Sequence, residues 1–194
     1  MKKLIIFLLI LFIPLFLFWN AIFVPLGSQE QILFSIEKGQ GTSNIALNLQ
    51  KQGLIRSAFF FKAYIFLKGD MAKLKAGTFL LSPSMTASRI AEMIVLGETA
   101  KKNLIILEGE SIKDIAIKLK DDNFLKAVKK DFDFDFLKDK PENLDLEGYL
   151  FPDTYEVSLD NPADELVAKA LANFDKKLTP ELRAEIKRQR KSIF

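Results

Sequence analysis

The chain has 194 residues, is 49% hydrophobic and 27% charged, and carries a formal net charge of +3. It contains no cysteine and no histidine, which excludes disulfides, thiolate or imidazole metal sites, and catalytic Cys-His or Ser-His-Asp groups. Acid–base chemistry near neutral pH must therefore use a carboxylate, a tyrosine or a lysine; no metal or cofactor is implied, and the near balance of charges argues against nucleic acid as a partner.

An almost wholly apolar segment runs from Leu4 to Val24, interrupted only by Pro14 and Asn20. As a helix it would be about 30 Å long, which is the thickness of a bilayer's hydrocarbon core. Two lysines precede it and the next basic residue is Lys38, so the positive-inside rule places the N-terminus in the cytoplasm. We expect residues 1–27 to form a cytoplasmic N-terminus and a transmembrane anchor, which contacts the lipid bilayer through residues 4–24.

The expected location is the cytoplasmic (inner) membrane, with a single pass and the bulk of the chain on the outer, periplasmic side. A cleaved signal peptide is the alternative, but its apolar core would be about 7–15 residues long and followed by a small-residue cleavage site. The run here is longer and no Ala-x-Ala sequence follows it, which favours an uncleaved anchor.

Beyond this segment, one pattern recurs: an apolar residue, a Gly or Ser turn, and an Ile-Ala pair that begins six residues after the turn residue. The copies are Ile36, Gly39, Ile45-Ala46; Ile106, Gly109, Ile115-Ala116; and, more weakly, Ser84, Ile90-Ala91. The pattern predicts a short strand, a glycine turn, a polar N-cap and an amphipathic helix. The turn at residues 39–43 could be taken for a phosphate loop, but it lacks the Walker lysine and spacing.

Between the copies, residues 57–67 are rich in phenylalanine and predict a buried helix, and residues 75–81 predict a strand led by Gly77. The resulting order of strand, helix, helix, strand and helix is typical of an α+β fold. Further on, the alternating Asp-Phe run at 131–136 predicts either a two-faced strand or a loop whose rings dock on the body. Pro162 and Pro180 each open a helix, and the ending Ser-Ile-Phe, residues 192–194, is interpreted as the beginning of a buried element.

Residues 146–155, Leu-Glu-Gly-Tyr-Leu-Phe-Pro-Asp-Thr-Tyr, combine two carboxylates with aromatic rings. Rings stack on the C–H faces of sugars, and a partly apolar setting can raise a carboxyl pKa for proton transfer. The candidate substrate-cleft residues are therefore Glu147, Tyr149, Asp153 and Tyr155. Alternatives stay open: Glu147 could cap a turn or pair with a lysine, Asp153 could close an Asx turn, and some of the rings must belong to the core.

In these motifs and their order, the chain resembles the N-terminal part of the endolytic murein transglycosylase family (YceG-like proteins). The segments that carry the resemblance are residues 34–39 before Ile45-Ala46, 74–79, 82–86, 107–111 and, above all, 146–155. The resemblance implies a transmembrane helix, a LysM-like α+β subdomain over residues 28–100, and an incomplete N-terminal part of a YceG-like catalytic domain over residues 101–194.

The resemblance also implies an activity. Such enzymes cleave linkages between N-acetylmuramic acid and N-acetylglucosamine in nascent peptidoglycan strands and leave 1,6-anhydroMurNAc ends. One glutamic acid protonates the leaving oxygen, and the muramic C6 hydroxyl then closes on C1. The implied partners are peptidoglycan glycan strands and cell-wall synthases.

The sequence departs from the family at the catalytic glutamate, which belongs to a later motif of the type Ala-Ser-Ile-hydrophobic-Glu-Lys/Arg-Glu. That motif does not occur here and is expected after Phe194, so the resemblance assigns no catalytic residue in this chain. We therefore expect an inactive fragment of a longer enzyme. The alternatives are a non-catalytic, membrane-tethered glycan-binding or scaffold module, and a hydrolase that uses Glu147 itself.

Overall fold

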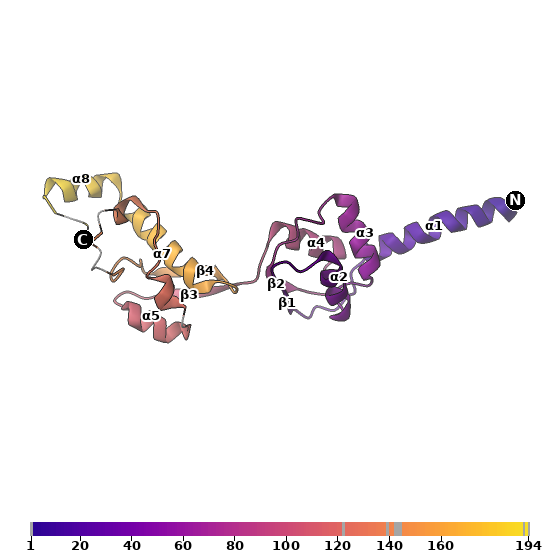
Figure 1. Cartoon of the computed structure of the whole chain (residues 1–194), viewed down its shortest axis with the longest axis horizontal. Helices are drawn as coiled ribbons and strands as arrows, with labels where there is room; N and C mark the ends of the chain where they lie inside the picture. The colour runs from indigo at the N-terminus through magenta and orange to yellow at the C-terminus, as the bar shows by residue number, and fades with distance from the viewer. Residues whose placement is uncertain (1, 122, 139, 142–144, 192, 194) are drawn as a thin grey trace. The chain divides into compact units, whose positions relative to one another are not determined.

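The computed structural model describes residues 2–121, 123–138, 140–141, 145–191 and 193. The chain divides into two compact units, residues 1–100 (unit 1) and residues 101–194 (unit 2), which are considered separately (Figure 1). Each unit combines helices with one two-stranded sheet. The predicted ending at residues 192–194 lies outside the described residues except for Ile193, which packs against the core of unit 2.

Helix α1 (Lys2–Phe23) begins unit 1, and its last turns belong to the core of that unit. Ile22 is fully buried and Ala21 is nearly so. Phe18 makes an edge-on contact with Phe60, with ring centroids 5.9 Å apart, and Phe23 makes a similar contact with a neighbouring tyrosine. The C-terminal end of the apolar run is therefore used for packing within the protein.

This arrangement corrects the prediction of a membrane anchor. Among the helices of the described residues, none is both long enough and apolar enough to cross a membrane. The predicted transmembrane anchor within residues 1–27, its lipid contact through residues 4–24 and the single-pass location in the cytoplasmic membrane are therefore wrong. The fold class is corrected accordingly, by removal of its transmembrane helix. An apolar run suits a protein core as well as lipid, and here its end is buried in a core.

The remainder of unit 1 is a two-stranded antiparallel sheet with three helices packed around it. Its elements are β1 (Ile32–Ile36), α2 (Thr42–Lys51), α3 (Ala58–Lys68), β2 (Gly77–Leu81) and α4 (Ala87–Leu96). Phe34 and Phe79 face each other across the strands and are buried. The helix expected to be buried, α3, buries only one face, because Phe59 and Phe66 on its other face are 74% and 68% exposed.

Unit 2 is built around a second antiparallel pair of strands. Its elements are β3 (Lys101–Ile106), α5 (Ile112–Leu119), α6 (Phe124–Ala127), the 3₁₀ helix η1 (Asp135–Leu137), β4 (Asp153–Ser158), α7 (Pro162–Lys177) and α8 (Pro180–Arg188). A capping box between Ser111 and Asp114 starts α5. Residues 131–136 form a loop that leads into η1, and Phe136 packs in the core. Of the two predicted alternatives, the structure therefore has the loop with a docked ring and not the strand.

The two units repeat one plan. Apart from η1 and the flanking helices α1 and α8, each follows the order strand, helix, helix, strand, helix, and its strands pair antiparallel. In all four strand-to-helix connections, a buried residue near the strand end is followed nine positions later by a buried helical residue. These pairs are Ile36 and Ile45, Leu81 and Ile90, Ile106 and Ile115, and Val157 and Leu166. The backbone φ of Gly39 and of Gly109 is +82° and +81°, a left-handed conformation that favours glycine.

Candidate functional site

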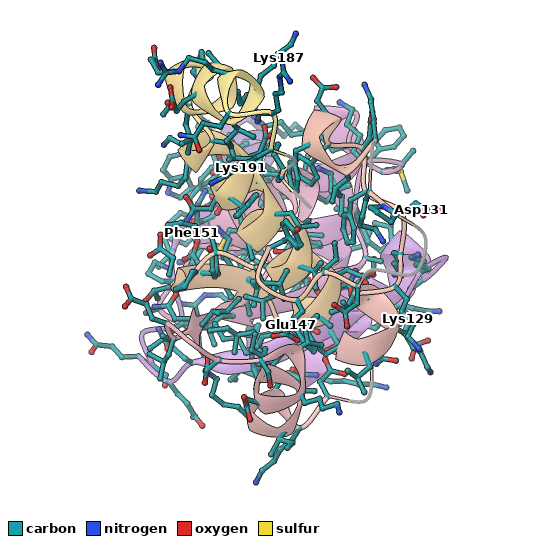
Figure 2. The ribbon with its side chains drawn as sticks, turned by 90° about the vertical axis from the view of Figure 1, so that its left-hand side faces the viewer. Lys129, Asp131, Glu147, Phe151, Lys187 and Lys191 are labelled. Carbon is teal, nitrogen blue, oxygen red and sulfur yellow. The ribbon has the colours of Figure 1, made fainter. Side chains whose placement is uncertain are left out.

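A cleft with a volume of about 940 Å³ lies in unit 2. It is bounded by the start of α5, by α6 with the segment after it, and by the start of the 146–155 decapeptide. In Figure 2, Glu147 lies beside α5, and Lys129 and Asp131 lie on the segment that follows α6. The lining residues are Ser111, Ile112, Lys113, Leu125, Val128, Lys129, Lys130, Asp131, Phe132, Leu137, Lys140, Asp145, Leu146 and Glu147.

The cleft combines an apolar floor with a charged rim. Ile112, Val128 and Leu146 are each less than 9% exposed and form the floor. Both lysines and carboxylates surround this floor, so neither positive nor negative charge dominates the cleft. An apolar surface with polar groups at its edge suits a ligand that has both C–H faces and hydroxyl or amide groups.

Glu147 is exposed and holds two parts of the cleft together. Its carboxylate oxygens accept the backbone N–H of Ile112 at 3.0 and 3.3 Å. Its own backbone N–H donates to Oδ1 of Asp145 at 2.9 Å. Because the N–H groups of a first helical turn have no partner within the helix, Glu147 satisfies one at the start of α5. In this arrangement Glu147 acts as a hydrogen-bond acceptor.

Tyr149 points into the protein and does not line this cleft. Its hydroxyl donates to the carbonyl of Ile193 at 2.9 Å. Its ring lies 6.4 Å from that of Phe136 and 5.3 Å from that of Phe174, measured between centroids. Burial raises the pKa of Tyr149 above its ordinary value.

Asp153 and Tyr155 are joined by Asn173 of α7. The amide of Asn173 donates to Oδ2 of Asp153 at 2.9 Å and to the Tyr155 hydroxyl at 3.2 Å. The hydroxyl of the buried Tyr155 donates to the carbonyl of Phe151 at 2.5 Å. Burial, with a smaller contribution from the charge of Asp153, raises the pKa of Tyr155, while the Asn173 hydrogen bond lowers it. This cluster fixes the decapeptide against α7.

Of the four predicted site residues, only Glu147 is placed in the cleft; Tyr149, Asp153 and Tyr155 hold the loop behind it. The sequence reasoning missed the basic residues of the rim, among them Lys113 and Lys129. Lys113 could have been noticed in the sequence, because it occupies the first turn of a helix, where acidic side chains are more favourable than basic ones. Within the described residues, no group of three or more Asp or Glu could hold a metal ion.

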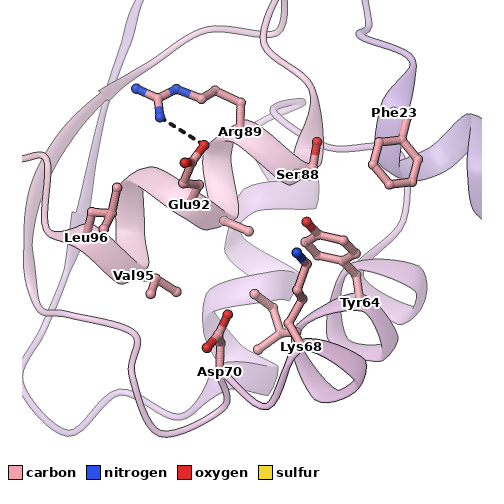
Figure 3. Close-up of a pocket in the computed structure, with 11 residues that line it drawn as sticks. Phe23, Tyr64, Lys68, Asp70, Ser88, Arg89, Glu92, Val95 and Leu96 are labelled. Carbon is pink, nitrogen blue, oxygen red and sulfur yellow. Dashed lines mark hydrogen bonds and ion pairs between the residues drawn. The ribbon is translucent and has the colours of Figure 1, made fainter.

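Unit 1 has two smaller hollows. One, of about 390 Å³, lies where α3, α4 and the end of α1 meet, and an ion pair between Arg89 and Glu92 spans 3.0 Å at its edge (Figure 3). The other is a groove of about 490 Å³ along β1 and α2, lined by Ser35, Glu37, Gln40, Asn44, Leu47, Asn48 and Lys51.

Comparisons with known proteins agree on one family. The family model described as the YceG-like family matches residues 34–193. The endolytic murein transglycosylase of Bacillus subtilis is 26% identical over 199 residues, which cover 92% of this chain and 55% of that protein. The protein of the same name from Streptococcus pneumoniae (strain D39) is 25% identical over 187 residues, which cover 81% of this chain and 34% of that protein.

A crystal structure of a YceG-like protein from Listeria monocytogenes is 27% identical, with a TM-score of 0.38, and the match covers 86% of this chain and 61% of that one. The chain spans about half the length, or less, of the curated relatives it matches.

Proposed function

Because the chain belongs to the YceG-like family, we propose that it acts on peptidoglycan as part of an endolytic murein transglycosylase. The observation that carries the proposal is the position of the decapeptide within the matched region. Its acidic residue Glu147 stands on the rim of the 940 Å³ cleft, beside an apolar floor. The proposed substrate is a glycan strand of alternating N-acetylmuramic acid and N-acetylglucosamine, and the proposed products carry 1,6-anhydroMurNAc ends.

In this proposal, unit 2 contributes substrate binding. The apolar floor faces the C–H surfaces of the sugars, and the rim side chains reach their hydroxyl, amide and carboxylate groups. Glu147 positions α5 against the decapeptide and is not assigned the role of proton donor, because its carboxylate accepts a backbone N–H. The order β1, α2, α3, β2 supports the assignment of residues 28–100 to a LysM-like subdomain, and residues 101–194 belong to the catalytic domain.

A second candidate function is glycan binding without cleavage. It is favoured by the way the two acids of the decapeptide are held. Glu147 is bound to the backbone of α5, and Asp153 is bound to Asn173 and to the N–H of Thr154. Carboxylates held in this way act as hydrogen-bond acceptors that stabilise a binding surface.

The two functions are separated by incubating the chain with purified peptidoglycan. Binding is measured by co-sedimentation, and cleavage by mass spectrometry of the released ends. We expect the chain to sediment with peptidoglycan and Lys129→Glu to weaken this, while Glu181→Gln, on the distant surface of α8, serves as the control. Anhydro ends from the chain alone would establish cleavage, whereas a chain that stays in the supernatant would contradict both candidate functions.

A further inference from the structure

The hollow of about 390 Å³ in unit 1, formed by α3, α4 and the end of α1, has apolar walls (Figure 3). The rings of Phe23 and Tyr64 meet edge-on in one wall, with their centroids 6.1 Å apart. Across the hollow, α4 contributes the aliphatic side chains of Val95 and Leu96. This volume is near the lower end of the range of about 300–1,000 Å³ that is usual for ligand pockets, so the hollow suits a small ligand or the end of a longer one.

Four charged side chains line the hollow, and three of them are paired with a side chain of opposite charge. Asp70 accepts a hydrogen bond from Lys73 at 2.8 Å. Arg89 is shared between Glu92 at 3.0 Å and Glu98 at 2.6 Å. In Figure 3 the Glu92 carboxylate turns toward Arg89, away from the centre of the hollow. These groups hold one another and are not available to a charged ligand.

The fourth charge, on Lys68, forms no ion pair or hydrogen bond with another described residue. Its Nζ lies 5.9 Å from the centre of the Tyr64 ring, one turn earlier on α3. The Tyr64 hydroxyl also forms no hydrogen bond within the described part of the chain. Figure 3 shows the Lys68 ammonium and the Tyr64 hydroxyl side by side, both directed into the space between α3 and α4, with Ser88 on the α4 side. An ammonium and a hydroxyl therefore stand together at an apolar surface.

This combination selects among classes of ligand. A neutral apolar molecule would remove water from the Lys68 ammonium and give it no partner, which is unfavourable. A small inorganic anion would pair with Lys68 but leave the apolar walls in water. A fatty acid would pair with Lys68 and cover the walls, but it would bury the Tyr64 hydroxyl without a hydrogen bond. The end of a peptide with small side chains supplies all three groups: a carboxylate, an amide and apolar methyl groups.

We propose that this hollow binds the free carboxyl terminus of a peptide with small apolar side chains, whose carboxylate pairs with Lys68 and whose last amide bonds to the Tyr64 hydroxyl. The inference rests on the proposed function only in its choice of source, which is the peptide that peptidoglycan strands carry. Unit 1 would then hold the peptide part of the polymer, separately from the sugar part in the cleft of unit 2.

The test is a titration of the full, isotope-labelled chain with diacetyl-L-Lys-D-Ala-D-Ala, followed by amide NMR shifts. The same peptide with an amidated carboxyl terminus lacks the charge, and acetate lacks the apolar part. The variant Lys68→Gln removes the ammonium, and Tyr64→Phe removes only the hydroxyl. Lys62→Gln removes a lysine from the same helix outside the hollow and serves as the matched control. Lys68 is exposed, so its substitution should leave the fold intact.

We expect the acid peptide to shift amides of α3 and α4 around the hollow. Amidation of the peptide or Lys68→Gln should weaken binding by about tenfold or more, because a charged hydrogen bond is lost, and Tyr64→Phe by about threefold. Lys62→Gln should bind as the wild type does. Equal binding of the acid and amidated peptides would overturn the inference, as would equal binding by the Lys68→Gln and Lys62→Gln variants, or acetate that binds as tightly as the peptide.

This outcome is distinguishable from that of the proposed function. Binding of the acid peptide that depends on Lys68, in a chain that does not sediment with peptidoglycan, would contradict the proposed function and leave this site in place. A chain that sediments with peptidoglycan but does not bind the acid peptide would overturn this inference alone.

Discussion

Units 1 and 2 share their order of elements but differ most in the segment between the second helix and the second strand. In unit 1 it is the short stretch from Gly69 to Ala76, and in unit 2 it is the much longer one from Val128 to Pro152. Each segment contacts the start of the helix that follows the first strand of its unit, which is α2 in unit 1 and α5 in unit 2. Thr42 donates from its hydroxyl to the carbonyl of Met71 at 3.1 Å, and Ile112, its counterpart, donates from its N–H to Glu147.

The comparison shows how the cleft arises. In unit 1, the short segment contacts the start of α2 through the carbonyl of Met71. In unit 2, Glu147 of the longer segment contacts the start of α5, and other described residues of that segment, among them Asp131, Phe132 and Leu137, line the cleft of about 940 Å³. The candidate site is therefore an elaboration of a contact that both units have. Glu147 is the residue that keeps this contact while the cleft opens around it.

The largest expected effects on the free energy of unfolding come from substitutions at core positions that correspond between the two units. Ile90 in α4 and Leu166 in α7 are both fully buried and occupy the same place in the plan. Replacing either with alanine should lower the free energy of unfolding by about 2–5 kcal/mol. If the units are separate folding units, Ile90→Ala should increase amide exchange in residues 32–96 only, and Leu166→Ala in residues 101–178 only. Equal loss of protection in both units after either substitution would show that they unfold together.

A smaller effect is expected at the contact between the long segment and α5. Glu147→Gln keeps the shape but removes the charge from the hydrogen bond to Ile112, which should cost about 1–2 kcal/mol. Hydrogen exchange at the Ile112 amide is the direct measurement. The counterpart Thr42→Val should cost about 0.5–1.5 kcal/mol, because its hydrogen bond is neutral. If Thr42→Val had the larger effect, Glu147 would not be the main support of the cleft.

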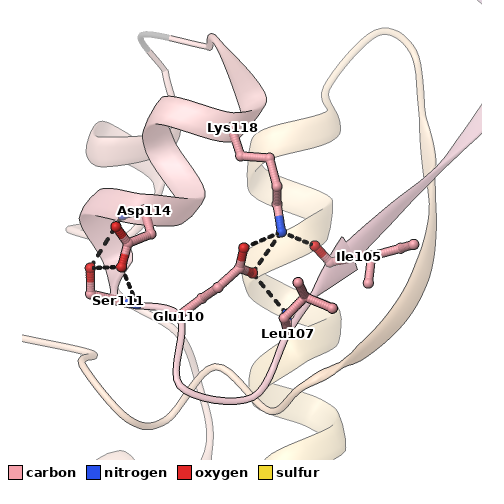
Figure 4. A network of polar contacts seen from close by, with 6 residues as sticks. All are labelled: Ile105, Leu107, Glu110, Ser111, Asp114 and Lys118. Carbon is pink, nitrogen blue, oxygen red and sulfur yellow. Dashed lines mark hydrogen bonds and ion pairs between the residues drawn. The ribbon is translucent and has the colours of Figure 1, made fainter.

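The ion pair between Lys118 and Glu110 in unit 2, which spans 2.6 Å (Figure 4), should give a pH-dependent contribution that the uncharged residues at the corresponding positions of unit 1, Gln40 and Asn48, do not give. Hydrogen bonding from the Leu107 N–H, followed by that from Lys118, lowers the pKa of Glu110 in the folded protein, so its ionised form adds stability above the unfolded value of about 4.3, and this is lost as the pH falls through the lowered pKa. Glu110→Gln should destabilise the protein by about 1 kcal/mol at neutral pH. The difference should shrink below about pH 4. Urea unfolding at several pH values measures it, with Gln40→Ala as a control that should show no such pH dependence.

Much of the repeated plan could be predicted from the sequence, because its signals are local. A glycine at positive φ and an Ile-Ala pair at fixed spacing identified the connections after β1 and β3, and a weaker pattern identified the one after β2. The fourth copy, from Val157 to Leu166, was not recognised, because its turn contains Asp160-Asn161-Pro162 and no glycine. This connection keeps the nine-residue spacing between its two buried residues, but the residues of its turn differ from those of the other copies.

The cleft and the fate of the apolar N-terminal segment could not be predicted in the same way. Glu147 was identified by its neighbours in the sequence, but its partner is a backbone N–H 35 residues away. Tyr149 and Tyr155 looked like ring surfaces for a sugar, whereas their hydroxyls bind carbonyls of the protein. The segment ending at Phe23 has the composition of a membrane span, and composition alone does not distinguish burial in lipid from packing on α3.

The smallest expected effect on stability concerns the surface beside the Glu110–Lys118 pair. Here unit 2 exposes Ile105, Leu107 and Ile117, at 50%, 57% and 75%, where unit 1 has Ser35, Glu37 and Leu47. Because Ile117 is mostly in water already, Ile117→Ser should change the free energy of unfolding by less than about 0.5 kcal/mol. Removing exposed apolar area should nevertheless reduce binding of a hydrophobic dye and self-association at high concentration. A loss of several kcal/mol would instead mean that Ile117 is packed against another part of the protein in solution, and that this surface is covered in unit 2 where its counterpart in unit 1 is open.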